Sequence, residues 1–214
     1  MLNRFAAFVL LLVAAALPAQ TPSVHQIAQQ VDEHYNRLHS LRAGFTETYE
    51  GMGARRTESG TLLLLKPGRM RWDYTSPAGK LFLLDGQYAW SYARGAAQVQ
   101  RIPAKKLDDL RSPLSFLLGH TQIEKELTNL QLAPGAGGAY LLTGQPKGQQ
   151  NRVRLVRLSV TGAGAISALE IEEQDGALTR FAFTNEQPNA AAPDSAFHFT
   201  PPPGVPVVDA TAPL

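Results

Sequence analysis

The sequence predicts a mainly β protein of the α+β class, in which about eleven antiparallel strands form a curved sheet or barrel with helices on one face. Three observations predict this fold. Apolar residues alternate with a period of two along most of the chain after Leu41. Turn residues such as Asp85-Gly86 separate the alternating segments. Most consecutive segments lack an intervening helix, so neighbouring strands are expected to pair antiparallel.

Residues 1–19 have the pattern of a secretory signal peptide. Arg4 gives a basic start, residues 5–17 are almost wholly apolar, and Ala19 is a small residue before Gln20. The apolar run of about 13 residues is shorter than the roughly 20 that a bilayer-spanning helix needs, so a membrane anchor is disfavoured. We expect cleavage after Ala19, with Ala16 as an alternative, and a single exported domain over residues 20–214.

Residues 23–39 are expected to form one amphipathic helix. Ser23 and Gln26, three positions apart after Pro22, form a capping box. The apolar positions that recur at helical spacing are Val24, Ile27, Ala28, Val31, Tyr35 and Leu38. This stripe is expected to pack on the sheet.

The strands are expected in two groups around a short helical interruption. The first group is 41–50, 57–65, 69–75, 80–84, 88–93 and 97–102, and the second is 129–133, 139–145, 153–161, 166–173 and 177–185. Asp85-Gly86 is a strong hairpin signal. Short helices are expected at 107–110 and 112–118, the second bounded by Pro113 and Gly119. The tail from Pro201 is Pro-rich and expected to be extended.

Aromatic residues mark one face of several strands. The stripes are Met70, Trp72 and Tyr74; Tyr88, Trp90 and Tyr92; and Phe181 and Phe183. Arg69, Arg71 and Asp73 occupy the other face of their strand. The stripes alone favour a solidly packed core, with helices on the sheet. The alternative, which we put forward as a prediction, is that the face with Met70, Trp72, Tyr88 and Trp90 lines an apolar site for a ligand.

Composition excludes several function classes. The chain has no cysteine, which excludes disulfides, cysteine-based metal or redox chemistry and a lipidated N-terminal cysteine. The formal charge of +2 is spread along the chain, so nucleic-acid binding is not expected. The sequence lacks phosphate-binding and nucleophile-elbow motifs, so we expect no catalytic residues, no metal and no cofactor.

The ionisable residues that could suggest a site have structural interpretations. His25, His34 and His39 lie on or beside the first helix without the spacing of a zinc site, and we expect them at the surface. Glu170 and Glu172 alternate with Leu169 and Ile171. They are therefore expected on the solvent face of a strand rather than as catalytic carboxylates.

Several stretches together resemble the periplasmic outer-membrane lipoprotein carrier family, LolA. The longest runs from Gly60 to Tyr74 and includes Lys66-Pro67-Gly68 and Trp72-Asp73-Tyr74. The others are Leu41 to Glu47, Leu84-Asp85-Gly86 with Trp90, Ser112-Pro113-Leu114, and Phe197 to Val205. Their order and spacing agree with the family over nearly all of residues 20–214.

The resemblance implies an unclosed antiparallel β-barrel with a helical lid, which together enclose an apolar cavity for lipoprotein acyl chains. It implies a soluble periplasmic carrier that takes acylated lipoproteins from an inner-membrane ABC-type release complex to an outer-membrane lipoprotein acceptor. We expect a monomer. The candidate acyl-binding residues are Phe45, Met70, Trp72, Tyr88, Trp90, Leu114, Phe116, Leu117, Phe181 and Phe183.

Lys66 departs from the family pattern. In the family that this chain resembles, an arginine precedes the proline that corresponds to Pro67. The resemblance implies that a residue at this position bonds the lid in its closed state. Lysine keeps the charge but loses the planar fork of donors. We expect Lys66 to bond carbonyls at the C-terminal end of helix 112–118 when the site is empty.

Three other functions remain open at this stage. The same fold could serve a periplasmic binding protein for another lipid or glycolipid, or a lipoprotein-sensing regulatory module. A secreted hydrolase is the third, and the lack of a convergent Ser/His/Asp set disfavours it.

Overall fold

The computed structural model describes residues 21–109 and 122–210, and it begins with the amphipathic helix α1 (Val24–Asn36). The predicted capping box is present: the Gln26 amide donates to Ser23 Oγ at 3.2 Å, and the Ser23 amide donates to Gln26 Oε1 at 2.8 Å. Ile27, Ala28 and Val31 are fully buried on its inner face. The helix therefore follows the sequence stripe and packs against the sheet.

Twelve strands form one sheet among these residues. Their bounds are β1 (Ser40–Gly51), β2 (Ala54–Leu65), β3 (Arg69–Ser76), β4 (Lys80–Leu84), β5 (Tyr88–Ala93), β6 (Val99–Pro103), β7 (Leu127–Pro134), β8 (Tyr140–Pro146), β9 (Val153–Val160), β10 (Ile166–Glu173), β11 (Leu178–Pro188) and β12 (Val207–Asp209). Their spatial order is β12-β6-β5-β4-β3-β2-β1-β11-β10-β9-β8-β7. The predicted unclosed barrel is confirmed, because the two end strands in this order, β12 and β7, are not paired with each other.

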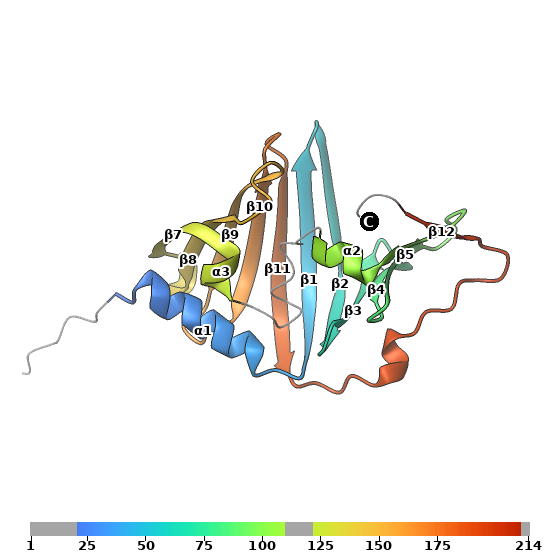
Figure 1. The fold of residues 1–214 in the computed structure, drawn as a ribbon, viewed down its shortest axis with the longest axis horizontal. Helices are drawn as coiled ribbons and strands as arrows, with labels where there is room; N and C mark the ends of the chain where they lie inside the picture. The colour runs from blue at the N-terminus through green and yellow to red at the C-terminus, as the bar shows by residue number, and fades with distance from the viewer. Residues whose placement is uncertain (1–20, 110–121, 211–214) are drawn as a thin grey trace, which may run out of the picture.

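The three α-helices of the described residues lie on one side of the sheet (Figure 1). Helix α1 and the short α3 (Ile123–Glu126) pack together over β7, while α2 (Ala104–Asp109) packs on β5 and β6. We call the face that carries α1 the helix side and the opposite face the outer side. Helix α2 corresponds to the helix expected at 107–110. The helix expected at 112–118 lies outside the described residues.

Two elements differ from the sequence prediction. The tail from Pro201 was expected to be extended and was assigned no strand, whereas Val207–Asp209 forms β12, which pairs with β6. This pair is parallel, so the all-antiparallel expectation is wrong at this edge. Helix α3, a single turn, was not predicted. Both elements are too short to show a periodic pattern.

The outer side has its own small core under the C-terminal segment. Leu63, Leu81 and Leu83 pack against Phe197 of the 3₁₀-helix η3 (Asp194–Phe197). Arg69 Nη1 donates to Asp194 Oδ1 at 2.8 Å, and Arg71 Nη1 donates to the Ala196 carbonyl at 2.9 Å. The arginine face of β3 predicted from the sequence thus holds this segment against the sheet.

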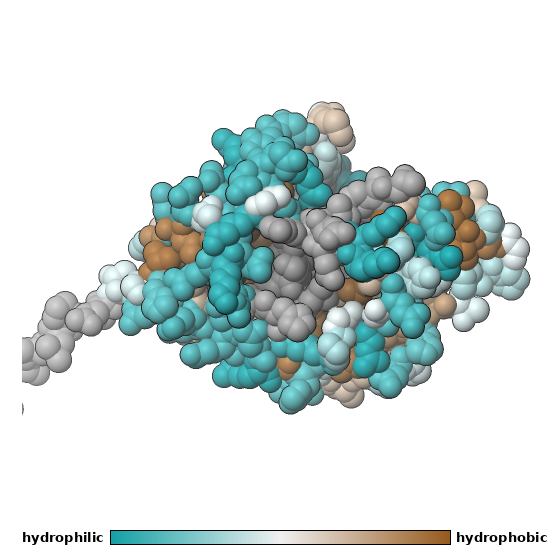
Figure 2. All heavy atoms as spheres, in the orientation of Figure 1, coloured by the Kyte–Doolittle hydropathy of each residue, from teal (hydrophilic) through white to brown (hydrophobic). Residues whose placement is uncertain are grey.

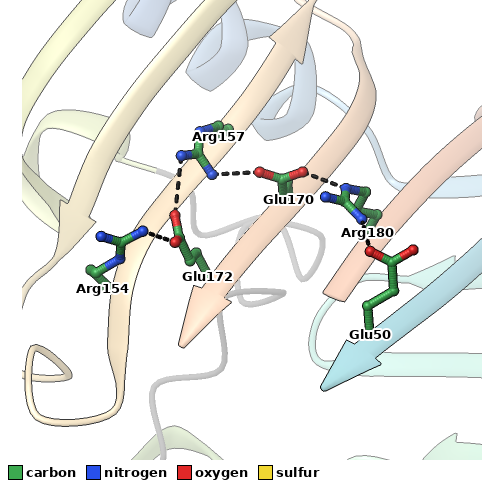
Figure 3. Close-up of polar contacts among 6 residues, drawn as sticks. All are labelled: Glu50, Arg154, Arg157, Glu170, Glu172 and Arg180. Carbon is green, nitrogen blue, oxygen red and sulfur yellow. Dashed lines mark hydrogen bonds and ion pairs between the residues drawn. The ribbon is translucent and has the colours of Figure 1, made fainter. Parts of the chain in front are cut away.

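A ladder of ion pairs covers another part of the outer side (Figure 3). Glu170 joins Arg157 and Arg180, Arg180 also contacts Glu50 at 2.8 Å, and Glu172 contacts Arg157 at 3.1 Å. Glu170 and Glu172 lie on the face opposite Leu169 and Ile171, as expected, but the expected exposure to solvent is wrong for Glu172, which is only 8% exposed. Arg154 and Arg157 both pair with Glu172.

We predict that Glu170→Gln lowers the free energy of unfolding by about 1 kcal/mol at low salt, because both arginine contacts weaken and the groups are partly exposed. Urea unfolding of this variant and of Glu33→Gln, an exposed site on α1, measures the effect. The difference should shrink in molar salt. An unchanged midpoint at low salt would show that the ladder contributes no net stability.

Candidate functional site

An aromatic cluster lies at the centre of the sheet on the helix side. Phe45 on β1, Trp72 on β3 and Phe181 on β11 are 3%, 3% and 6% exposed. The ring centroids of Phe45 and Trp72 are 4.5 Å apart at 72°, and those of Trp72 and Phe181 are 5.7 Å apart at 60°. Phe183 stacks on Phe181 at 6.2 Å. Such edge and offset contacts stabilise aromatic pairs beyond their buried area.

Strand register explains how these distant residues meet. In β1 and β11, Phe45 pairs with Phe183, and Phe181 lies two positions away on the same face. Trp72 reaches the cluster across Leu62 of β2. Met70 extends the face beside Leu64 and Leu84. Five of the ten predicted residues, Phe45, Met70, Trp72, Phe181 and Phe183, therefore share one apolar face with α1.

Tyr88 and Trp90 correct the sequence prediction, because they lie on the outer side. Trp90 pairs with Leu83, whereas Trp72 pairs with Phe82, so the two tryptophans point to opposite faces. Trp90 packs against Phe199 with ring centroids 5.8 Å apart, and its Nε1 donates to Asp85 Oδ2 at 2.7 Å. The expectation that Met70, Trp72, Tyr88 and Trp90 line one face is wrong. Leu114, Phe116 and Leu117 lie outside the described residues.

Lys66, at the junction of β2 and the turn to β3, contacts α1. Its Nζ donates to the Tyr35 carbonyl at 2.5 Å, and its backbone amide donates to the His39 carbonyl at 2.9 Å. The Tyr35 carbonyl lies in the last turn of α1, where the helix dipole favours a cation. Partial burial lowers the pKa of Lys66. A bond to helix 112–118 stays a prediction.

A polar junction that the sequence did not predict lies nearby. His34, expected at the surface, is 6% exposed, and its Nε2 is 2.6 Å from Glu186 Oε1. Tyr35 Oη accepts from the Ile166 amide at 2.9 Å and donates to Glu186 Oε2 at 3.4 Å. Burial raises the pKa of Tyr35, and Glu186 adds to the rise. These bonds fix the C-terminal half of α1 to β10 and β11.

The described residues show neither a metal-binding cluster nor a membrane-spanning helix. Within residues 21–109 and 122–210, no group of three His, Asp or Glu side chains has a metal-binding arrangement. In the same ranges, no helix is long and apolar enough to cross a membrane. The helix side is largely hydrophilic at its surface, with apolar patches near β7 and β8 and at the other end near β12 (Figure 2).

The family model for the outer membrane lipoprotein carrier protein LolA matches residues 36–200, which include every strand of the aromatic cluster. The chain belongs to the LolA family. A protein named outer-membrane lipoprotein carrier protein from Chromobacterium violaceum is 33% identical over 193 residues, 90% of each chain. One of the same name from Nitrosomonas europaea is 29% identical and covers 94% of this chain and 97% of its own.

Solved structures with similar folds have little sequence identity to this LolA-family chain. An uncharacterised conserved protein from Thermus thermophilus has a TM-score of 0.56 at 14% identity, covering 88% of this chain and all of that one. A DUF1329 family protein from Desulfovibrio piger has a TM-score of 0.50 at 13% identity, covering 83% and 98%. At such identities the likeness concerns the fold alone. The family assignment depends on the sequence matches.

Proposed function

We propose that this LolA-family protein is a lipoprotein carrier that holds acyl chains against the aromatic cluster on its helix side. The observation that carries the proposal is the convergence of Phe45, Trp72 and Phe181 on the face that α1 covers, in a chain of this family. An acyl chain lying there would displace packed side chains or the helices above them. Binding and release would then need movement of the helices but no covalent step.

Transfer energetics favour such a face for the task. Moving a sixteen-carbon acyl chain from a bilayer into water costs about 12 kcal/mol, at roughly 0.8 kcal/mol per methylene. A carrier must offset most of this cost by supplying apolar surface. It must also release the cargo, so its face should be about as apolar as the bilayer. Aromatic side chains supply large apolar area with few rotatable bonds.

The proposal includes where the carrier works and with whom. Cleavage after residues 1–19 would release it into the periplasm. It would collect acylated lipoproteins from an inner-membrane ABC-type complex and pass them to a lipoprotein acceptor at the outer membrane. It would act as a monomer and without catalysis. These assignments extend the family name to this chain, and each is open to test.

The two tryptophans provide a direct test, because they lie on opposite faces. In Trp90→Phe, emission comes from Trp72 alone, and we expect it to shift when a synthetic acylated lipopeptide binds. In Trp72→Phe, emission comes from Trp90 on the outer side, and we expect little shift. Titration of both variants measures binding and locates it.

Two outcomes would contradict the proposal. An emission shift confined to Trp90 would place the ligand on the outer side. No shift in either variant would mean that the helix side is a packed core that binds no acyl ligand. Mass spectrometry of material that co-purifies from the periplasm distinguishes cargo classes. Free phospholipid or glycolipid without lipoprotein would favour the alternative of another lipid-binding protein.

A further inference from the structure

A cluster of ionisable side chains lies on the helix side beside the aromatic cluster. We call it the polar cluster; its members are Glu47, Arg56, Glu58, Tyr74 and Lys80. Glu47 and Glu58 pair across β1 and β2, two positions beyond Phe45 toward the β1–β2 hairpin. The Tyr74 and Phe45 ring centroids are 5.1 Å apart. The polar cluster therefore begins where the aromatic cluster ends, away from Lys66 and the end of α1.

The contacts within the polar cluster organise it around Lys80. The Lys80 ammonium donates to the Glu58 carboxylate and lies 4.3 Å from the centre of the Tyr74 ring. Arg56 Nε lies 3.3 Å from the other Glu58 oxygen. Side-chain exposure rises from 6% for Glu58 through 28% for Lys80 to 58% for Arg56. Charged groups thus lead from solvent to the edge of an apolar face.

Placing charged groups at the edge of an apolar face costs desolvation energy. Burial raises the pKa of the Glu47 carboxyl, and burial with the nearby carboxylates raises that of the Tyr74 hydroxyl. Both shifts indicate that charge is disfavoured here. Buried ion pairs can often be replaced by apolar residues without loss of stability. Because Lys80 and Arg56 are also partly exposed, their pairing with Glu58 contributes little net stability, and a bound ligand supplies a second reason for charges on this face.

Lys80 is also able to serve a ligand. Within the described part of the chain, its hydrogen-bond acceptor is Glu58, which occupies one of the three donors of an ammonium group. Two donors remain for acceptor oxygens of a bound molecule. A chain lying along Phe45 and Trp72 would bring its head group to this point, since Tyr74 and Lys80 follow directly in space.

We propose that Lys80, oriented by Glu58 and Tyr74, forms a subsite for the ester and amide carbonyl oxygens at the head of an acylated lipoprotein. The subsite rests on the proposed carrier function and adds to it a preference for acyl over alkyl chains. The aromatic cluster binds the chain, and Lys80 fixes which end of the ligand lies toward the β1–β2 hairpin. A carbonyl oxygen is a stronger hydrogen-bond acceptor than an ether oxygen, and a methylene group accepts no hydrogen bond.

The test compares a diacylated lipopeptide with its dialkyl ether analogue, which has equal chains and lacks the ester carbonyls. We expect the wild type to bind the ester form about tenfold more tightly, which is the size expected of a hydrogen bond to a charged donor. The double variant Glu58→Met/Lys80→Met removes both partners of this ion pair together, so Glu58 is not left buried without its lysine, and Glu47 keeps Arg56 as a nearby cation. It should bind the two lipopeptides equally and keep the wild-type affinity for the ether form.

Controls separate this inference from the carrier function. Lys125→Met removes an exposed lysine from α3 and should keep the ester preference. Tyr74→Leu removes the ring that lies under Lys80 and keeps both charged partners, so it should reduce that preference even if the double variant folds poorly. An ester preference that survives in both polar-cluster variants would overturn the subsite while leaving the carrier function intact. Failure of the wild type to bind either lipopeptide would overturn both.

Discussion

Gly164→Ala is expected to lower the free energy of unfolding by about 3 kcal/mol, because alanine fits neither the backbone conformation nor the space at this position. Gly164 has φ +82° in the turn between β9 and β10. A Cβ there would lie 2.2 Å from the Gln30 carbonyl oxygen of α1 and 3.2 Å from His34 Cβ. The helix backbone cannot yield as a flexible side chain could. The substitution should therefore push α1 away from the sheet.

Urea unfolding and amide hydrogen exchange check this expectation together. The Ile166 amide donates to Tyr35 Oη, so its protection should fall in Gly164→Ala as α1 moves. Gly162→Ala is the matched control, since a Cβ at Gly162 meets none of the described atoms within 4 Å and its turn is the same. Equal unfolding midpoints for the two variants would mean that α1 does not press on this turn.

Gly164 also illustrates what sequence reasoning can and cannot predict. Residues Gly162-Ala163-Gly164 predict a hairpin loop from local chemistry alone, and the loop is where they place it. The positive φ of Gly164 is a local reason for glycine, but the second reason, the close approach of the Gln30 carbonyl, lies in α1, far earlier in the chain. Local signals fix turns and strands, whereas close approach between distant segments depends on the complete fold.

The opposite placement of Trp72 and Trp90 has a related cause. Alternation within each strand is visible in the sequence, and both stripes are real. The number of residues in the β3–β4 and β4–β5 turns decides which side chains of β5 lie on the same face of the sheet as Trp72. A change of one residue in that number moves every side chain of the strand to the opposite face. The β3–β4 connection around Pro77 has no two-residue hairpin signal that fixes this count. Register, rather than hydrophobicity, made the single-face prediction fail.

His34 was missed although a signal was present. It lies three positions after Val31 and four before Leu38, on the buried stripe of α1. Histidine is intermediate in its tendency to be buried, and the lack of zinc-site spacing led to a surface position being expected in spite of the helical spacing. Its partner Glu186 is far away in sequence, so nothing local indicated a satisfied buried site. Two members of the aromatic cluster, by contrast, could be predicted from the sequence, because Trp72 and Phe181 lie on alternating apolar stripes, whereas Phe45 was indicated only by the family resemblance.

Replacing Lys66 is expected to loosen α1 without unfolding the sheet. Lys66→Met keeps the length of the side chain but removes the donor to the Tyr35 carbonyl. A hydrogen bond from a charged donor contributes roughly 1.5–3 kcal/mol, about a tenfold to hundredfold change in an equilibrium between docked and released helix. The lowered pKa of Lys66 shows that desolvation opposes the charged donor, which places the effect toward the lower end.

Exchange and transfer measurements distinguish a latch from a passive contact. In Lys66→Met, the Arg37 and Leu38 amides at the end of α1, which donate to the Glu33 and Tyr35 carbonyls, should exchange about tenfold faster. Lys66→Arg restores a donor and should return slow exchange. If α1 must be released before a ligand can reach the aromatic cluster, Lys66→Met should load acylated lipopeptide faster than the wild type. It should also transfer the lipopeptide to acceptor vesicles more slowly, because the variant favours the open, cargo-binding state over the closed, empty state. Faster amide exchange with unchanged loading and delivery would show that Lys66 stabilises α1 without controlling access to the aromatic cluster. Amide exchange at the wild-type rate would show that the hydrogen bond to the Tyr35 carbonyl does not stabilise the docked helix.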